Sequence, residues 1–264
     1  MAFAVDSREH WVEVPGDILF AREWCPDTPH GAPVVLLHDS LGSVAQWREF
    51  PEALAAATGR AVIAYDRLGF GASSQRTEQL TVGFIDDEAE VYLPALVRAL
   101  GLDAHVLFGH SVGGGMALAA AAQDGSCVAV ITEAAQAFVE ERTLAGIRAA
   151  REGFRDAAQF SRLEKWHGDK AGWVLDAWTE VWLSSAFRDW SLDPYLNRVH
   201  CPVLAIHGGV DEYGSEAFPR RITQGVSGPA RMELLAGCGH VPHRERQSDV
   251  LALVQGFLEG HAVP

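Results

Sequence analysis

The segment Gly109-His110-Ser111-Val112-Gly113 has the residue pattern of a nucleophilic serine. An apolar run, AHVLF, precedes it and a run of small residues, GGGMALAAAA, follows it, which predicts a sharp turn between a strand and a helix. Small residues on both sides allow the strand and the helix to approach closely. We therefore expect Ser111 to be a catalytic nucleophile; the alternative is a glycine-rich turn with an incidental serine.

A serine hydroxyl is a weak nucleophile, so it needs a general base, and the base needs an acid that orients it. The expected chain order is serine, acid, histidine. Asp211 follows the apolar run VLAIHG and His240 follows the next one, MELLAG, so both are predicted on loops at the same sheet edge as Ser111. We take Asp211 as the acid and His240 as the base. Glu212, the neighbour of Asp211, is the alternative acid.

Three other histidines are predicted to have structural rather than catalytic roles. His38 ends the run VVLLH, and we expect it to support the turn that follows. His207 ends a buried strand and is predicted in the core. His243 is predicted at the surface or just behind the site.

Alternation of short apolar runs with longer helical patterns predicts an α/β fold with a mostly parallel sheet. The predicted strands, the first two forming a hairpin, are His10 to Val14, Ile18 to Arg22, Val34 to His38, Ala61 to Tyr65, His105 to Phe108, Val128 to Thr132, Val203 to His207 and Met232 to Leu235. Apolar spacing near 3.6 residues predicts helices over Val44 to Thr58, Ile85 to Leu100, Gly113 to Gln123, Ser215 to Gly225 and Ser248 to Leu258.

Residues 135–197 interrupt the alternation, because they have helical periodicity and no convincing strand. We predict a helical cap inserted into a core domain of residues 1–134 and 198–264. Five of the eight tryptophans lie in this segment. Four are predicted to contact substrate, Trp166, Trp173, Trp178 and Trp182; the alternative is that they only pack the cap onto the core.

Composition excludes several classes of protein. Acidic residues outnumber basic ones 35 to 21, for a formal charge of −14, and no basic run is present, so nucleic-acid binding is not expected. The first residues lack the pattern of a signal peptide and no run is apolar enough for a membrane helix, so we expect a cytoplasmic protein that does not bind membranes. The four cysteines have no metal-ligand spacing and are expected to be free thiols.

The motifs together resemble those of the α/β-hydrolase superfamily, in the branch of small bacterial esterases, enol-lactonases and C–C bond hydrolases with a helical cap. The resemblance covers nearly the whole chain and depends on the turn after His38, the segment DRLGFGAS at 66–73, the GHSVG elbow, the GGVDEY loop and the GCGHVPH loop. It implies an eight-stranded α/β-hydrolase fold and the triad of Ser111, Asp211 and His240. It also implies an oxyanion hole formed by the backbone N–H groups of Val112 and Ser40, with Leu41 as the alternative to Ser40.

Two positions depart from the family pattern. Asp39 stands where a glycine usually follows the first-turn histidine. Val241 stands where C–C bond hydrolases usually carry tryptophan after the catalytic histidine, which argues against that activity.

We therefore expect a serine hydrolase that cleaves a small-molecule ester, lactone or thioester through an acyl-enzyme on Ser111. No cofactor and no metal are expected to take part. C–C bond hydrolysis, perhydrolysis and a receptor-like binding role remain alternatives. The sequence does not predict whether the chain is a monomer or a dimer.

Overall fold

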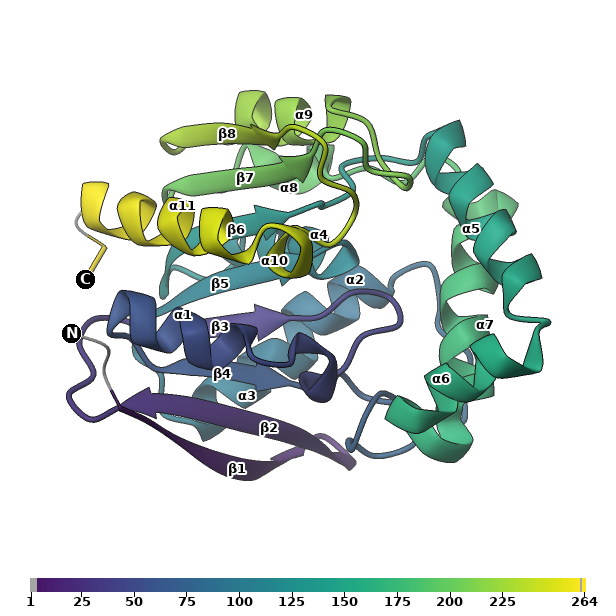
Figure 1. The fold of residues 1–264 in the computed structure, drawn as a ribbon, viewed down its shortest axis with the longest axis horizontal. Coiled ribbons are helices and arrows are strands. Elements are labelled where there is room, and N and C mark those ends of the chain that lie inside the picture. Colours follow the sequence, from purple (N-terminus) through teal and green to yellow (C-terminus); the bar gives the residue numbers. More distant parts are fainter. Residues whose placement is uncertain (1–3, 262) are drawn as a thin grey trace.

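A single eight-stranded sheet forms the centre of the computed structural model, which describes residues 4–261 and 263–264 (Figure 1). The strand order is β1-β2-β4-β3-β5-β6-β7-β8, and β3 to β8 are parallel while β1 and β2 form an antiparallel hairpin at one edge. The strands are β1 (Val5–Val14), β2 (Asp17–Pro26), β3 (Val34–Leu37), β4 (Val62–Tyr65), β5 (His105–His110), β6 (Cys127–Glu133), β7 (Val203–Gly208) and β8 (Ala230–Leu235). The predicted eight-stranded, mostly parallel sheet is confirmed.

Two hydrophobic cores lie on opposite faces of this sheet, because successive residues of a strand point to opposite sides. In β3, Val35 and Leu37 belong to one core, and Val34 and Leu36 belong to the other. Every residue of β3 is fully buried, as expected for a central parallel strand covered by helices on both faces.

Helices cover both faces of the sheet (Figure 1). The core with Val34 includes residues of α1 and α11, and the core with Val35 includes residues of α2, α3, α4, α8 and α9. The helices of these layers are α1 (Phe50–Thr58), α2 (Phe84–Asp87), α3 (Leu93–Ala99), α4 (Val112–Ala121), α8 (Asp193–Leu196), α9 (Ala217–Gly225), α10 (Pro242–Glu245) and α11 (Gln247–Gly260).

Proline interrupts two of the predicted helices. The helix predicted from Val44 consists of a 3-10 turn, Val44–Trp47, and α1, with Pro51 in the first turn of α1. The helix predicted from Ile85 contains a π-helical turn, Glu88–Tyr92, just before Pro94. Proline has no N–H to donate within a helix, so it suits a helix start and disturbs the hydrogen bonds of the preceding turn.

The connection between β6 and β7 is helical and stands apart from the sheet. Helices α5 (Glu141–Gly153), α6 (Ala157–His167) and α7 (Ala171–Trp182) lie together beyond the carboxyl ends of the central strands (Figure 1). His167 ties them to the core, since its Nδ1 accepts a hydrogen bond from Gly71 N–H at 3.0 Å and its Nε2 donates to Leu41 O at 2.9 Å. The boundaries proposed for a separate cap domain stay a prediction.

In the part of the chain that the structure describes, no helix combines the length and the apolar character needed to cross a membrane.

Candidate active site

The chain turns sharply at Ser111, between β5 and α4. Ser111 has φ 56° and ψ −125°, a conformation that is costly for a residue with a side chain. The two glycines of the motif allow this turn. A Cβ at Gly109 would lie 2.2 Å from Gly113 O, and a Cβ at Gly113 would lie 2.2 Å from Leu37 O, so no side chain fits at either position.

The structure brings Ser111, His240 and Asp211 together from three loops at one sheet edge. Ser111 Oγ lies 3.0 Å from His240 Nε2, and His240 Nδ1 lies 2.9 Å from both carboxylate oxygens of Asp211. All three residues are buried. A base in this position can take the hydroxyl proton while the carboxylate holds the ring in the required tautomer.

Asp211 is held as a carboxylate. Burial by itself would raise the pKa of Asp211, but the hydrogen bond and charge of His240 and the hydrogen bond from Tyr213 N–H lower it below its ordinary value. Tyr213 N–H donates to Asp211 Oδ1 at 2.7 Å. Glu212, the alternative acid, has an exposed side chain and makes no hydrogen bond to His240 among the described residues. The geometry therefore favours Asp211.

The turn after β3 places backbone donors near Ser111. Leu41 N–H donates to Asp39 Oδ1 at 2.8 Å, so this donor is already occupied. Ser40 N–H has no acceptor among the described residues. Val112 is the first residue of α4, where an N–H has no partner within its own helix. Of the two alternatives for the second oxyanion donor, the geometry favours Ser40 over Leu41.

A cavity of about 160 Å³ opens beside Ser111. Its walls combine polar groups with aromatic and aliphatic side chains, and Trp178 and Trp182 both belong to them. These two residues are four positions apart on α7, so they lie on one face of that helix.

The other two tryptophans predicted at the substrate do not line this cavity. Trp173 lies on another face of α7, where its ring packs against Phe70 with a centroid distance of 5.6 Å and its Nε1 donates to Glu78 O at 3.0 Å. Trp166, on α6, lies beside the ammonium group of Lys165. Trp173 thus lies away from the cavity-facing side of α7, and Trp166 lies on a different helix.

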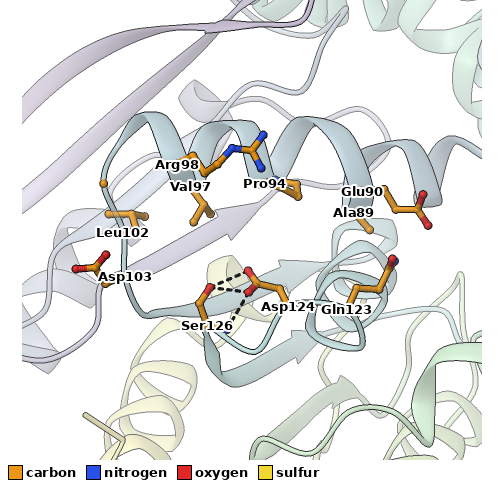
Figure 2. Close-up of a pocket in the computed structure, with 11 residues that line it drawn as sticks. Ala89, Glu90, Pro94, Val97, Arg98, Leu102, Asp103, Gln123, Asp124 and Ser126 are labelled. Atoms are coloured by element: carbon orange, nitrogen blue, oxygen red, sulfur yellow. Dashed lines mark hydrogen bonds between the residues drawn. The ribbon is translucent and has the colours of Figure 1, made fainter.

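A larger hollow, about 650 Å³, lies elsewhere on the molecule, near the carboxyl end of α3 (Figure 2). Its lining includes Glu90, Arg98 and Asp124 but no histidine beside a serine or cysteine. Asp124 in it is already hydrogen-bonded to Ser126, at 2.7 Å (Figure 2). No histidine base lines this hollow to activate the Ser126 hydroxyl, so the smaller cavity is the better candidate for the chemistry.

Sequence reasoning missed Gln136, which lines the cavity and whose amide nitrogen lies 3.2 Å from Ser111 Oγ. The available signal was its position, four residues beyond the predicted end of a parallel strand, at the edge where the other site residues collect. Its neighbours in sequence are two alanines, which gave no chemical pattern.

Sequence reasoning also missed a buried network of ionisable groups behind Ser111. His110 Nδ1 lies 3.2 Å from Asp39 Oδ2, and His110 Nε2 donates to His240 O at 2.8 Å. His243 Nδ1 lies 2.5 Å from Glu133 Oε2. The surface position offered for His243 is wrong, because its side chain is buried against Glu133 and the ring of Trp47.

The surroundings of His110 in this network favour its doubly protonated form. Burial would lower the pKa of His110, but the hydrogen bond and charge of Asp39, with the charge of Glu133, raise it to about 9. His110, Glu133 and His243 lie close enough for their ligand atoms to surround a metal ion. Both ring nitrogens of His110 already have partners, since Nε2 donates to His240 O and Nδ1 lies 3.2 Å from Asp39 Oδ2.

Two positions predicted to be structural are confirmed as such by their contacts. His38 accepts a hydrogen bond from Arg67 N–H at 3.1 Å and donates to Asp39 O at 2.8 Å, directly below the turn. His207 is buried in β7, and burial lowers its pKa. The four cysteines are free thiols.

Comparison with known proteins supports the assignment of the fold. The family described as "alpha/beta hydrolase fold" matches residues 32–174. A curated relative, proline iminopeptidase from Lactobacillus delbrueckii subsp. bulgaricus, is 26% identical over 86% of this chain and 90% of its own length.

Solved structures with the same fold include a proline iminopeptidase of Mycobacterium smegmatis, with TM-score 0.76, 21% identity and coverage of 96% of this chain and 98% of that one. The enol-lactonase from Burkholderia xenovorans LB400 has TM-score 0.73 and 20% identity, covering 95% and 100%. The esterase RhEst1 from a Rhodococcus has TM-score 0.74 and 22% identity, covering 97% and 99%. With its sheet, its elbow and a family match over more than half its length, this chain belongs to the α/β-hydrolase family.

Proposed function

We propose that this chain is a serine hydrolase that cleaves a carboxylic ester, lactone or thioester through an acyl-enzyme on Ser111. The observation that carries the proposal is one chain of hydrogen bonds, from Ser111 Oγ to His240 Nε2 at 3.0 Å and from His240 Nδ1 to Asp211 at 2.9 Å. This arrangement supports the roles proposed for the three residues as nucleophile, base and orienting carboxylate.

In the proposed mechanism, Ser111 Oγ attacks the acyl carbon while His240 takes its proton. The backbone N–H groups of Val112 and Ser40 bind the oxyanion of the tetrahedral intermediate. His240 then protonates the leaving group, and in the second half-reaction it takes a proton from the water that attacks the acyl-enzyme.

The cavity favours a small, uncharged acyl group. About 160 Å³ is little room, and the walls contributed by Ile147, Trp178, Trp182 and Tyr213 are largely apolar. Asp39 is the one carboxylate among the described residues that line it. Leu41 N–H donates to one of its oxygens and the His110 imidazolium pairs with its charge, so this pair offers little net negative charge to a substrate cation.

This last observation favours ester hydrolysis over the iminopeptidase activity for which the relatives are named. A peptide with a free amino terminus brings a positive charge that the site must pair, since burying an unpaired charge is costly. The cavity offers no uncommitted carboxylate for that purpose. We therefore rank ester, lactone and thioester substrates above aminopeptidase substrates.

The experiment treats the protein with a fluorophosphonate, locates the adduct by mass spectrometry, and compares kcat/KM for short p-nitrophenyl esters, a lactone, an acyl-thioester and L-proline p-nitroanilide. We expect labelling at Ser111, turnover of the small esters, and loss of several orders of magnitude in kcat for Ser111→Ala with the fold intact. Labelling elsewhere, or none, refutes the nucleophile. Faster cleavage of the proline anilide than of every ester refutes the substrate class.

A further inference from the structure

The loop that follows β6 is built tightly against the nucleophile turn. Its first residue, Ala134, has φ 51°, a left-handed conformation that costs a non-glycine residue about 1 kcal/mol or more. Its second residue, Ala135, lies so close to α4 that a Cβ at Gly114 would come within 2.5 Å of the Ala135 Cβ. The backbone before Gln136 is therefore fixed by the core rather than free to move.

Gln136 places its amide beside the reacting oxygen. Its side chain is only 5% exposed, and its Nε2 lies 3.2 Å and its Oε1 3.4 Å from Ser111 Oγ. Ser111 has one hydroxyl proton. Because Oγ lies closer to His240 Nε2, at 3.0 Å, than to Gln136, the hydroxyl donates to His240. Gln136 is then the donor to Ser111 Oγ, and its amide forms no other hydrogen bond with the described residues.

A buried amide whose N–H group donates to one oxygen stabilises that oxygen most when the oxygen carries the most negative charge. The negative charge on Ser111 Oγ changes during the proposed reaction. In the acyl-enzyme it is an ester oxygen, which accepts hydrogen bonds weakly. When the acyl-enzyme breaks down, Oγ departs with the electron pair of the broken bond and becomes a strong acceptor.

We propose that Gln136 is a further catalytic residue, whose amide N–H stabilises Ser111 Oγ as the leaving group in deacylation. This inference rests on the proposed function. Water adds its oxygen to the acyl carbon and gives a proton to His240. The bond between the acyl carbon and Oγ then breaks, Oγ receives the proton from His240 while Gln136 donates to it, and the carboxylic acid leaves.

The test separates the two half-reactions of p-nitrophenyl acetate hydrolysis. Acylation is read as p-nitrophenolate release with enzyme in excess, and deacylation as the decay of the acetyl adduct by intact-protein mass spectrometry. For Gln136→Leu we expect deacylation to slow by about 10- to 100-fold and acylation to stay within about threefold. Gln136→Glu keeps the shape of the side chain but has no hydrogen-bond donor when ionised. At neutral pH it should therefore deacylate as slowly as Gln136→Leu or more slowly.

A matched control is Gln123→Leu, which removes an amide that donates to Ala119 O at 3.3 Å, away from the site. Both rates of this variant should equal those of the wild type. The inference is overturned if Gln136→Leu slows both half-reactions equally, if it slows neither, or if Gln136→Glu deacylates at the wild-type rate. Absence of both p-nitrophenolate release and an acetyl adduct on Ser111 in every variant instead refutes the proposed function.

Discussion

The ion pair behind the nucleophile predicts a specific dependence of stability on pH. Asp39 and the buried His110 lie 3.2 Å apart, and this contact is the main reason that the pKa of His110 rises from 6.5 to about 9 against the effect of burial. Asp39→Asn removes the charge but keeps an oxygen that can accept from Leu41 N–H. The variant therefore isolates the ion pair and leaves the turn hydrogen bond in place.

The magnitude follows from proton linkage. A pKa that rises from 6.5 in the unfolded chain to about 9 in the folded protein corresponds to about 3 kcal/mol at most. The Asp39 side chain is 31% exposed, and the charge of Glu133 remains in the variant, so we expect Asp39→Asn to lose about 1 to 3 kcal/mol.

The sign of the pH dependence is fixed by the direction of the pKa shift. Protonated His110 stabilises the folded state, so this stabilisation is complete below pH 6.5 and is lost as the pH rises toward 9. Asp39 has a lowered pKa, so its contribution is lost instead at acidic pH. The wild type and Asp39→Asn should differ most near pH 6 and converge above pH 9.

Thermal unfolding across this pH range provides the assay. At about pH 6 the variant should unfold roughly 2 to 10 °C below the wild type, with the gap closing by about pH 9.5. Asp124→Asn is the control, because Asp124 lies 3.8 Å from His105, whose pKa burial lowers rather than raises. Parallel curves for wild type and Asp39→Asn over the whole range, or a histidine nitrogen NMR spectrum without an imidazolium at pH 7.5, would refute the reasoning.

Three further predictions concern the helix, the cavity and the acid. In denaturant titrations, Gly113→Ala should destabilise the fold by about 3 kcal/mol or more, because its Cβ would meet a backbone carbonyl oxygen at 2.2 Å. The Cβ of Gly115→Ala would have no neighbour nearer than 3.6 Å, so this variant should stabilise the fold by about 0.5 to 1 kcal/mol. Trp178→Ala should shift the kcat/KM ratio of short to long acyl esters by about 1 to 3 kcal/mol, and an unchanged ratio would remove Trp178 from specificity. Asp211→Asn should lower kcat by about four orders of magnitude and Glu212→Gln hardly at all; the reverse order would make Glu212 the acid.

The order of the strands along the chain, the nucleophile turn and the loops of Asp211 and His240 could be predicted from the sequence. Each depends on a pattern that is local in the chain, such as an apolar run, a glycine pair or a polar residue just after a strand. The prediction was weakest at the edge hairpin, where β1 begins at Val5 rather than His10. That part of the strand is polar because one edge of the sheet meets solvent, so it has no apolar signature.

Only the tertiary structure decided which polar groups meet Ser111 and which tryptophans reach the cavity. Gln136 lies 25 positions from Ser111 in the chain, and His243 lies 110 positions from Glu133. Unlike Asp211 and His240, which lie in loops with a recognisable pattern, neither Gln136 nor Glu133 belongs to a motif that marks its partner. Their contacts arise because parallel strands bring their carboxyl ends to one edge, and the packing of loops and helices there, rather than any local preference, fixes which side chains touch.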